Sequence, residues 1–179
     1  RLTYLAQYDA LTDLPNRRYL SESLDLAIGA AAAQARRTGV MFIDLDHFKK
    51  VNDMLGHGVG DQLLVLATKR LQACARPGDL VARLGGDEFA LILPDVVEDG
   101  DVAALCTSII DALAAPFLLQ GQQLFVSASI GIARYPEDGA SAEALLKSAD
   151  TAMYAAKHNG RGNFQFFSAA MHDATTQRI

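Results

Sequence analysis

The sequence predicts an α/β fold in which a βαββαβ core carries extra helices around a central sheet that contains antiparallel strands. Three observations predict this class: an apolar run at 39–46, two apolar runs at 80–84 and 89–93 that flank a pair of glycines, and an alternating run at 125–133. Strands separated by stretches with helical periodicity are typical of α/β and α+β domains. With 179 residues, half of them apolar, the chain is long enough to bury a core as about one domain.

The first half of the chain predicts a strand, a helix and a hairpin. The run at 39–46 is a short apolar strand that ends in acidic residues, and a helix with one apolar face follows over about 60–75. The next two apolar runs pair as a hairpin around Gly85 and Gly86, because glycine accepts the positive φ angles of a tight turn.

The second half predicts a helix, a strand and a further helix. Apolar residues recur at i, i+3, i+4 and i+7 over 102–113, which indicates an amphipathic helix. The run at 125–133 alternates apolar with small residues and predicts a half-buried strand. Ser141 is the expected N-cap of a helix that ends near Asn159. With a helix before the first strand and another after the last, the order is ferredoxin-like in the broad sense.

Composition excludes several classes of function. A net charge of −5 argues against a broad basic face for nucleic acid. Cys74 and Cys106 lie in apolar helical contexts, which favours reduced thiols over a disulfide or a zinc site. No apolar run approaches the ~18 residues of a transmembrane helix and no signal peptide is evident. We therefore expect a cytoplasmic fragment without membrane contact, whether or not its parent protein is anchored in a membrane.

Four acidic residues follow predicted strand ends. Asp44 and Asp46 end the first strand, and Asp87 and Glu88 follow the two glycines of the hairpin. Because a βαββαβ core brings these two places together, the four carboxylates are expected to approach one another. Converging carboxylates repel unless a cation lies among them, and oxygen ligands without a Cys or His cluster favour Mg²⁺ or Mn²⁺. The alternative is that the acids merely end a strand and decorate a turn.

The sequence also resembles a known family. Gly85-Gly86-Asp87-Glu88-Phe89 is the signature pentapeptide of the GGDEF family, the bacterial diguanylate cyclases. Further stretches that resemble the family's motifs, in family order, are "YDALTDLPNRRYL" (8–20), "DLDHFKKVNDMLGHGVGDQLL" (44–64), "SIGIARYP" (129–136) and "ADTAMYAAKHNGRGN" (149–163). The resemblance covers nearly the whole chain and implies the palm-like fold of nucleotidyl cyclases.

The resemblance implies a domain organisation as well. Residues 9–168 are expected to form the GGDEF domain. Residues 1–8 look like the end of a stalk helix that leads from an upstream sensor domain. Residues 169–179 resemble the connector that often precedes an EAL phosphodiesterase domain. The chain is thus expected to be a piece of a longer protein.

Members of the family join two GTP molecules into cyclic di-GMP and release two pyrophosphates. By motif position, the resemblance implies that Asp44, the carbonyl of Leu45, Asp87 and Glu88 hold Mg²⁺ (or Mn²⁺) on the phosphates, with Asp44, Asp87 and Glu88 as the catalytic acids. Asp87 is also the candidate to take the proton of the attacking 3′-hydroxyl. The chemistry is consistent, because cations neutralise charge on the reacting oxygens and a carboxylate can accept a proton.

The resemblance implies that Asn52 and Asp61 bind the guanine base. Both side chains carry oxygens that can accept hydrogen bonds from the donors on the guanine edge. The alternative is that Asn52 ends one helix and Asp61 starts the next. Gly85 and Gly86 would let the hairpin backbone approach the nucleotide.

The resemblance assigns the phosphates to Lys49, to the backbone N–H groups of His47 and Phe48 at a helix start, and to Lys157 and Arg161. Lys157 and Arg161 are four residues apart, so they would share one helical face if the helix extended that far. Compensation of charge at a helix C-terminus is the alternative for these two residues.

Two regulatory features are also expected. Arg76 and Asp79 form the RxxD pattern that binds inhibitory product in relatives, although "RPGD" is also a good turn between a helix and a strand. One nucleotide site per chain and two GTP molecules per reaction imply a symmetric homodimer. The alternatives to an active cyclase are a silent GTP- or cyclic di-GMP-binding module that controls an attached phosphodiesterase, and a merely structural domain.

Overall fold

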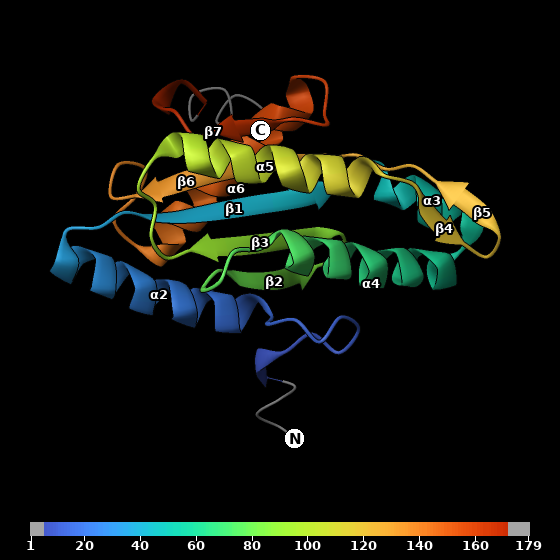
Figure 1. Ribbon diagram of the computed structural model, residues 1–179, viewed down its shortest axis with the longest axis horizontal. Coiled ribbons are helices and arrows are strands. Elements are labelled where there is room, and N and C mark those ends of the chain that lie inside the picture. The colour runs from blue at the N-terminus through green and yellow to red at the C-terminus, as the bar shows by residue number, and fades with distance from the viewer. Residues whose placement is uncertain (1–5, 172–179) are drawn as a thin grey trace.

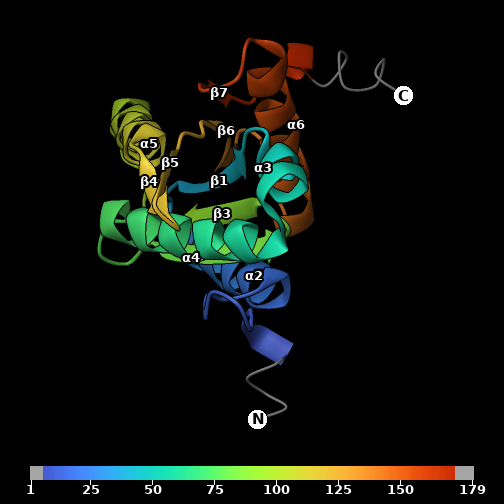
Figure 2. The ribbon, with the colours of Figure 1, turned by 90° about the vertical axis from the view of Figure 1, so that its right-hand side faces the viewer.

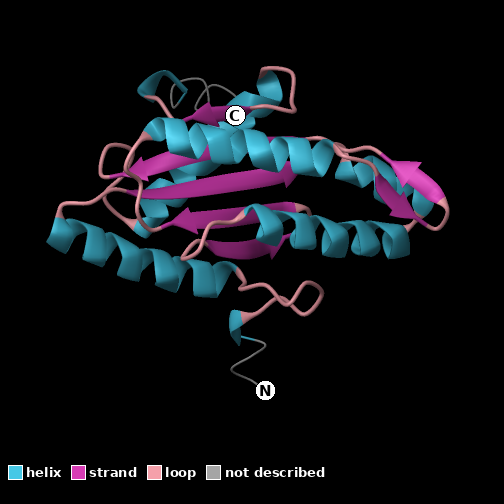
Figure 3. Cartoon of the chain, in the orientation of Figure 1, coloured by secondary structure: helices cyan, strands magenta, loops and turns pink. Residues whose placement is uncertain are grey.

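The computed structural model describes residues 6–171 of the chain. Its strands are β1 (Thr38–Leu45), β2 (Leu80–Gly85), β3 (Glu88–Leu93), β4 (Phe117–Leu119), β5 (Gln122–Leu124), β6 (Ala128–Tyr135) and β7 (Phe164–Phe166). Its helices are α2 (Arg17–Gln34), α3 (Phe48–Leu55), α4 (His57–Cys74), α5 (Asp99–Ala114) and α6 (Ala142–His158). A five-stranded sheet in the order β2-β3-β1-β6-β7 forms the centre, and β4 and β5 make a separate hairpin (Figures 1 and 3).

Helices cover both faces of the central sheet. Helices α4 and α5 pack on one face, where they bury Met41, Ile43 and Leu91 among others. Helices α2 and α6 pack on the other face against residues such as Val40 and Phe42. Figure 2 shows the sheet between these layers. All eight residues of β1 are buried, because the strand is central and covered on both sides.

Strand pairing brings distant segments together. Strand β1 pairs antiparallel with β3 and with β6, and β7 adds to β6 in parallel. The register sets Asp44 opposite Glu88 on one side and opposite Ser129 on the other. The turn between β2 and β3 therefore lies beside the end of β1. The predicted α/β class, with its mixed central sheet, is confirmed.

The structure corrects several element boundaries. Helix α4 begins at His57, three residues before the expected start, and β6 begins at Ala128 rather than at residue 125. The expectation of one solvent face on β6 is wrong, because α6 covers it and residues 128–133 are all buried. The sequence analysis missed β4, β5 and β7, which have three residues each. The predicted N-cap is confirmed: the Ser141 hydroxyl accepts a hydrogen bond of 3.1 Å from the Ala144 N–H.

The two ends of the chain fall largely outside the described residues. Of the expected stalk helix, only residues 6–8 are described, and residues 6 and 7 are helical. Of the expected connector, residues 169–171 are helical and residues 172–179 lie outside the described part. No helix within residues 6–171 is long and apolar enough to cross a membrane.

Gly131 lets α6 approach the sheet closely. A Cβ atom on Gly131 would lie 2.1 Å from the backbone nitrogen of Met153 and 2.2 Å from the carbonyl oxygen of Ala149, both in α6. Real Cβ atoms do not approach backbone this closely, so any side chain at this position would push the helix away from the strand.

We predict that Gly131→Ala destabilises the domain by about 3 kcal/mol, the upper range for overpacking, since neither backbone can yield locally. Urea unfolding measures the change. The matched control is Gly29→Ala, an exposed site inside α2 with no atom near the added Cβ. This control should stabilise by about 0.5–1 kcal/mol through helix propensity. Equal effects of the two substitutions would contradict the close-approach account.

Candidate functional site

A pair of coupled carboxylates lies where β1 ends beside the β2–β3 turn. Asp44 is 4% exposed, its carboxylate is coupled electrostatically to that of Asp87, and it forms an ion pair with the Lys157 ammonium of α6. The Leu45 N–H donates to the Asp87 carbonyl at 3.3 Å, which fixes the turn against β1. The expected meeting of Asp44, Asp87 and Glu88 is therefore seen in the structure.

The environment of these acids disfavours their charged forms. Burial, and then the neighbouring Asp44 carboxylate, raise the pKa of Asp87 to about 7. Burial also raises the pKa of Glu88, and the charges of Asp44 and Asp150 act in the same direction. Lys157 opposes both shifts. A site that gathers several carboxylates and raises the pKa of one of them to about 7 is suited to bind a cation or to transfer a proton.

The residues present fit a divalent cation. The Oδ1 atom of Asp44 is buried and has no hydrogen-bond partner, so one carboxylate oxygen is left for a ligand. Carboxylate oxygens are the donors that Mg²⁺ and Mn²⁺ prefer. Within residues 6–171 no three His, Cys, Asp or Glu side chains form a ready-made metal cluster. The structure thus supplies a pair of acids, and the wider ligand set with Leu45 and Glu88 stays a prediction.

Asp46 does not join this acidic pair. Its carboxylate instead accepts hydrogen bonds from the hydroxyls of Ser127 and Ser129 and from the Gly162 N–H. The expectation that Asp46 approaches Asp87 and Glu88 in an acidic cluster is not met, because β6 and the turn after α6 supply donors on the other side.

The two predicted guanine residues lie on adjoining helices. Asn52 is inside α3, and its Oδ1 atom is buried without a hydrogen-bond partner. It rests against Gly60, where a Cβ would lie only 1.8 Å from that oxygen. Asp61 is exposed on α4 and lines a hollow of about 410 Å³ with Leu11 and Leu118. The capping alternatives are wrong, since Asn52 and Asp61 both lie inside helices rather than at their ends.

The start of α3 faces the same end of the sheet. His47 precedes the helix with φ 63° and makes no side-chain cap, so the first N–H groups of α3, from Phe48 onward, are not satisfied by a capping side chain. Lys49 is exposed in the first turn. Helix N-termini with such N–H groups attract phosphate.

The structure separates the two predicted cations of the C-terminal segment. Helix α6 ends at His158, and Arg161 is exposed in the following turn with φ 64°. The helix does not extend to Arg161, so the condition for Lys157 and Arg161 to share a helical face is not met. Lys157 pairs with Asp44, which favours a role at the site over simple charge compensation at the helix end.

Arg83 and Asp9 support the hairpin, and sequence reasoning missed both. The Arg83 guanidinium donates to the Gly86 carbonyl at 2.8 and 3.0 Å and pairs with the Asp9 carboxylate at 2.9 Å. The backbone of Arg83 also donates to the Pro15 carbonyl. The segment at 8–20 thus braces the glycine turn. The signal was present in that stretch's match to a family motif, but no local pattern pairs it with Arg83.

A model of the family described as "Diguanylate cyclase, GGDEF domain" matches residues 6–163. The chain belongs to the GGDEF domain family.

Relatives agree with this assignment. The chain is 44% identical over 178 residues to the bifunctional diguanylate cyclase/cyclic di-GMP phosphodiesterase MucR of Pseudomonas aeruginosa, an alignment that covers 99% of this chain and 26% of MucR. The chain therefore spans about a quarter of the length of that relative.

Solved structures agree as well. A form of TpbB (YfiN) from Pseudomonas aeruginosa comprising only the GGDEF domain gives a TM-score of 0.91 at 40% identity, over 94% of this chain and 99% of that one. The coiled coil and GGDEF domain of DgcB from Caulobacter crescentus, in complex with c-di-GMP, gives 0.85 at 28% identity, over 92% and 87%. The palm-like fold expected from the GGDEF resemblance is confirmed.

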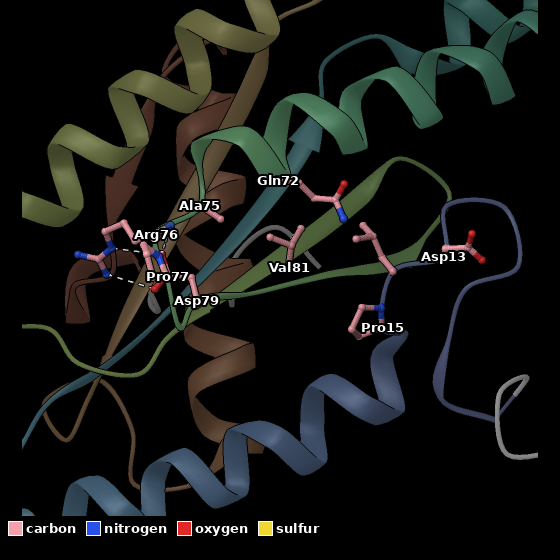
Figure 4. A pocket seen from close by; sticks show the side chains of 9 residues that line it. Asp13, Pro15, Gln72, Ala75, Arg76, Pro77, Asp79 and Val81 are labelled. Atoms are coloured by element: carbon pink, nitrogen blue, oxygen red, sulfur yellow. Dashed lines mark hydrogen bonds and ion pairs between the residues drawn. The ribbon is translucent and has the colours of Figure 1, made fainter.

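The GGDEF domain has a second polar feature at the far end of β2. Arg76 and Asp79 lie in the turn between α4 and β2, where the Arg76 backbone N–H and Nε donate to one Asp79 oxygen at 2.9 and 3.1 Å. They lie at one end of a hollow of about 440 Å³, with Asp13 at the other (Figure 4). The ion pair closes the turn, as the alternative expected, and Arg76 remains partly exposed beside the hollow.

We predict that the stability of the metal-free GGDEF domain depends on Asp87 in a pH-specific way. Because folding raises the pKa of Asp87 from 3.8 to about 7, the folded protein binds this proton more tightly. The contribution of this proton to the stability of the folded domain is fully present below about pH 4 and is lost as the pH rises through about 7. Asp87→Asn should therefore stabilise the protein relative to wild type at pH 8 but not at pH 4, by about 1–2 kcal/mol after allowance for solvent screening.

Urea unfolding with chelator at both pH values measures this difference. Magnesium should raise the stability of wild type at pH 8 and have a smaller effect on Asp87→Asn. If the free energies of unfolding of wild type and Asp87→Asn differed by the same amount at both pH values, the assignment of the raised pKa to Asp87 would be contradicted.

Proposed function

We propose that this GGDEF domain is a diguanylate cyclase that condenses two GTP molecules into cyclic di-GMP and releases two pyrophosphates. The single observation that carries the proposal is the coupled pair of Asp44 and Asp87 at the end of β1, near the start of α3, with one orphaned oxygen on Asp44 and a pKa near 7 for Asp87. Relatives named as diguanylate cyclases, and a GGDEF structure in complex with c-di-GMP, support the same substrate and product.

In this proposal the acids hold metal and move a proton. Asp44, Asp87, Glu88 and the carbonyl of Leu45 would hold Mg²⁺ (or Mn²⁺), which when bound neutralises charge on the phosphate oxygens. Asp87 would also accept the proton of the attacking 3′-hydroxyl. In the metal-free domain the pKa of Asp87 is raised to about 7, so this carboxyl binds a proton more readily than an ordinary aspartate.

The remaining residues bind and orient GTP. The Asn52 amide oxygen is an orphaned buried acceptor, and together with the Asp61 carboxylate it would accept from the N1–H and N2–H₂ groups of guanine. The phosphates would be held by Lys49, Lys157, Arg161 and the N–H groups of His47 and Phe48 at the α3 start. Gly85 and Gly86, both with positive φ, let the hairpin pass close to them.

The reaction needs two copies of the domain. Each chain offers one set of guanine and phosphate residues, and each of two GTP molecules must attack the other. We therefore propose that a symmetric homodimer is the active form, with two sites facing each other. In the parent protein, an upstream sensor domain would set this geometry through the segment at 1–8, residues 9–168 would form the catalytic domain and 169–179 would lead to an EAL domain. A cytoplasmic location is part of the same proposal.

A second candidate function is a regulatory module that binds GTP or cyclic di-GMP without turnover and controls an attached phosphodiesterase. The relative NbdA of Pseudomonas aeruginosa, which is named only as a cyclic di-GMP phosphodiesterase, gives this alternative its support. The intact set of acids and guanine residues favours the cyclase, since a binding module needs no coupled Asp44–Asp87 pair.

We predict that the purified domain converts GTP into cyclic di-GMP with magnesium, and that Asp87→Ala lowers the rate at least about 100-fold by removing both a metal ligand and the proton acceptor. Chromatographic separation of the products measures the rate. The matched control is Asp111→Ala on the exposed side of α5, which should leave the rate unchanged. The rate per mole of protein should rise with concentration if a dimer is active. Bound GTP with no product at high protein concentration would favour the regulatory module.

We also predict that Arg76→Ala weakens product inhibition about tenfold or more while the initial rate stays near that of wild type. Inhibition should weaken because the variant lacks the guanidinium that is proposed to bind the product. The initial rate should not change, because Arg76 lies at the end of β2 far from the acids and, among residues 6–171, its side chain pairs with Asp79. The initial rate, measured against added cyclic di-GMP, gives the inhibition constant. Unchanged inhibition would assign Arg76 and Asp79 to the turn alone.

A further inference from the structure

Asp46 is a buried carboxylate without an ion pair. It is 2% exposed, and within residues 6–171 the salt bridges do not include it. Burying a carboxylate is costly unless hydrogen bonds compensate for the lost water. Its partners therefore indicate what it contributes.

Three donors surround the Asp46 carboxylate. One oxygen accepts from the Ser129 hydroxyl at 2.7 Å, and the other accepts from the Ser127 hydroxyl at 2.5 Å and from the Gly162 N–H at 3.1 Å. The Asp46 N–H also donates to the Ser127 carbonyl at 2.9 Å. The residue thus joins the end of β1, the start of β6 and the turn after α6.

The turn held by Asp46 has an unusual backbone. Gly160, Arg161 and Gly162 all have positive φ, at 99°, 64° and 61°. This region is unfavourable for Arg161, so the surrounding hydrogen bonds must hold it there. The Arg161 N–H donates to Ala156, the Asn163 amide donates to the Arg161 carbonyl, and the Gly162 N–H donates to Asp46.

Two contacts fix the C-terminal segment against the end of β1. Asp44 pairs with Lys157 in the last turn of α6, and Asp46, two residues later, binds Gly162 beyond it. We propose that Asp46 is a positioning residue: through Gly162 it fixes the turn that carries Arg161 next to the end of β1, so that the guanidinium reaches the triphosphate. This inference rests on the proposed function, because it takes GTP as the ligand. Asp46 itself touches neither metal nor nucleotide in this role.

The variant Asp46→Asn tests the role with little change in shape. An amide oxygen is a weaker acceptor than a carboxylate oxygen, and an amide nitrogen turned toward Gly162 would meet its N–H donor, so the contact with Gly162 is weakened or lost. Arg161→Ala removes the group that Asp46 is proposed to place. The matched control is Asp138→Asn, a buried carboxylate at the opposite end of β6 that accepts from the Arg134 N–H and Nε.

The experiment measures binding of the non-reactive analogue α,β-methylene GTP with magnesium to the four proteins and to the double variant. We expect Asp46→Asn to weaken binding about tenfold, as does Arg161→Ala, and the double variant to bind no more weakly than either. Asp138→Asn should bind like wild type. Amide hydrogen exchange in residues 160–163 should accelerate in Asp46→Asn only.

Other outcomes overturn the proposal in distinguishable ways. Equal binding by Asp46→Asn and wild type, or a loss that adds fully to that of Arg161→Ala, overturns the positioning role alone. A wild-type protein that binds no analogue overturns the proposed function together with it. If Asp46→Asn does not fold, Ser127→Ala, which removes one donor to the same oxygen, enters the same cycle with Arg161→Ala. It should weaken binding about two- to threefold without additivity.

Discussion

Antiparallel pairing of β1 with β3 is the constraint on which the candidate site depends. It sets Asp44 opposite Glu88 and beside Asp87, although α3 and α4 separate these acids along the chain. Strand β1 also pairs with β6 and is buried on both faces, so the position of its end is fixed by both neighbouring strands and by the helices that cover the sheet. A group placed at the end of such a strand has little freedom to avoid its neighbour. Rigid elements of this kind are the ones that can hold charged groups in an unfavourable arrangement.

The acidic pair is unfavourable on its own, and the surrounding contacts explain how it persists. Burial and proximity raise the pKa of Asp87, while Lys157 pairs with Asp44 and reduces the local negative charge. Arg83 stabilises the glycine turn by donating a hydrogen bond to the Gly86 carbonyl. Groups whose pKa values are shifted by burial and by a specific partner are typical of functional sites. Because the buried Oδ1 atom of Asp44 has no hydrogen-bond partner, it is available to bind a cation that also contacts phosphates.

Much of the fold could be predicted because its elements carry strong periodicity or clear turn residues. The three-residue strands could not, since so short a run has no period, and β6 was placed too early because Phe125 to Ser127 continue its alternation without joining the sheet. The convergence of Asp44 with Asp87 followed from strand order. The role of Asp46 did not, because its donors come from β6 and the turn after α6. The end of this helix near Asn159 could be predicted, but the left-handed conformation of Arg161 could not, because no local pattern fixes a positive φ at an arginine.

The position of divalent cations in the nucleotide-bound domain would show whether Asp44 and Asp87 hold the metal. Crystals grown with Mn²⁺ and a non-reactive GTP analogue would locate the metal by its anomalous scattering. We expect a peak between the Asp44 and Asp87 carboxylates, in contact with the phosphates, with guanine against Asn52 and Asp61. Nucleotide bound without metal at Asp44, or metal bound elsewhere on the domain, would contradict it.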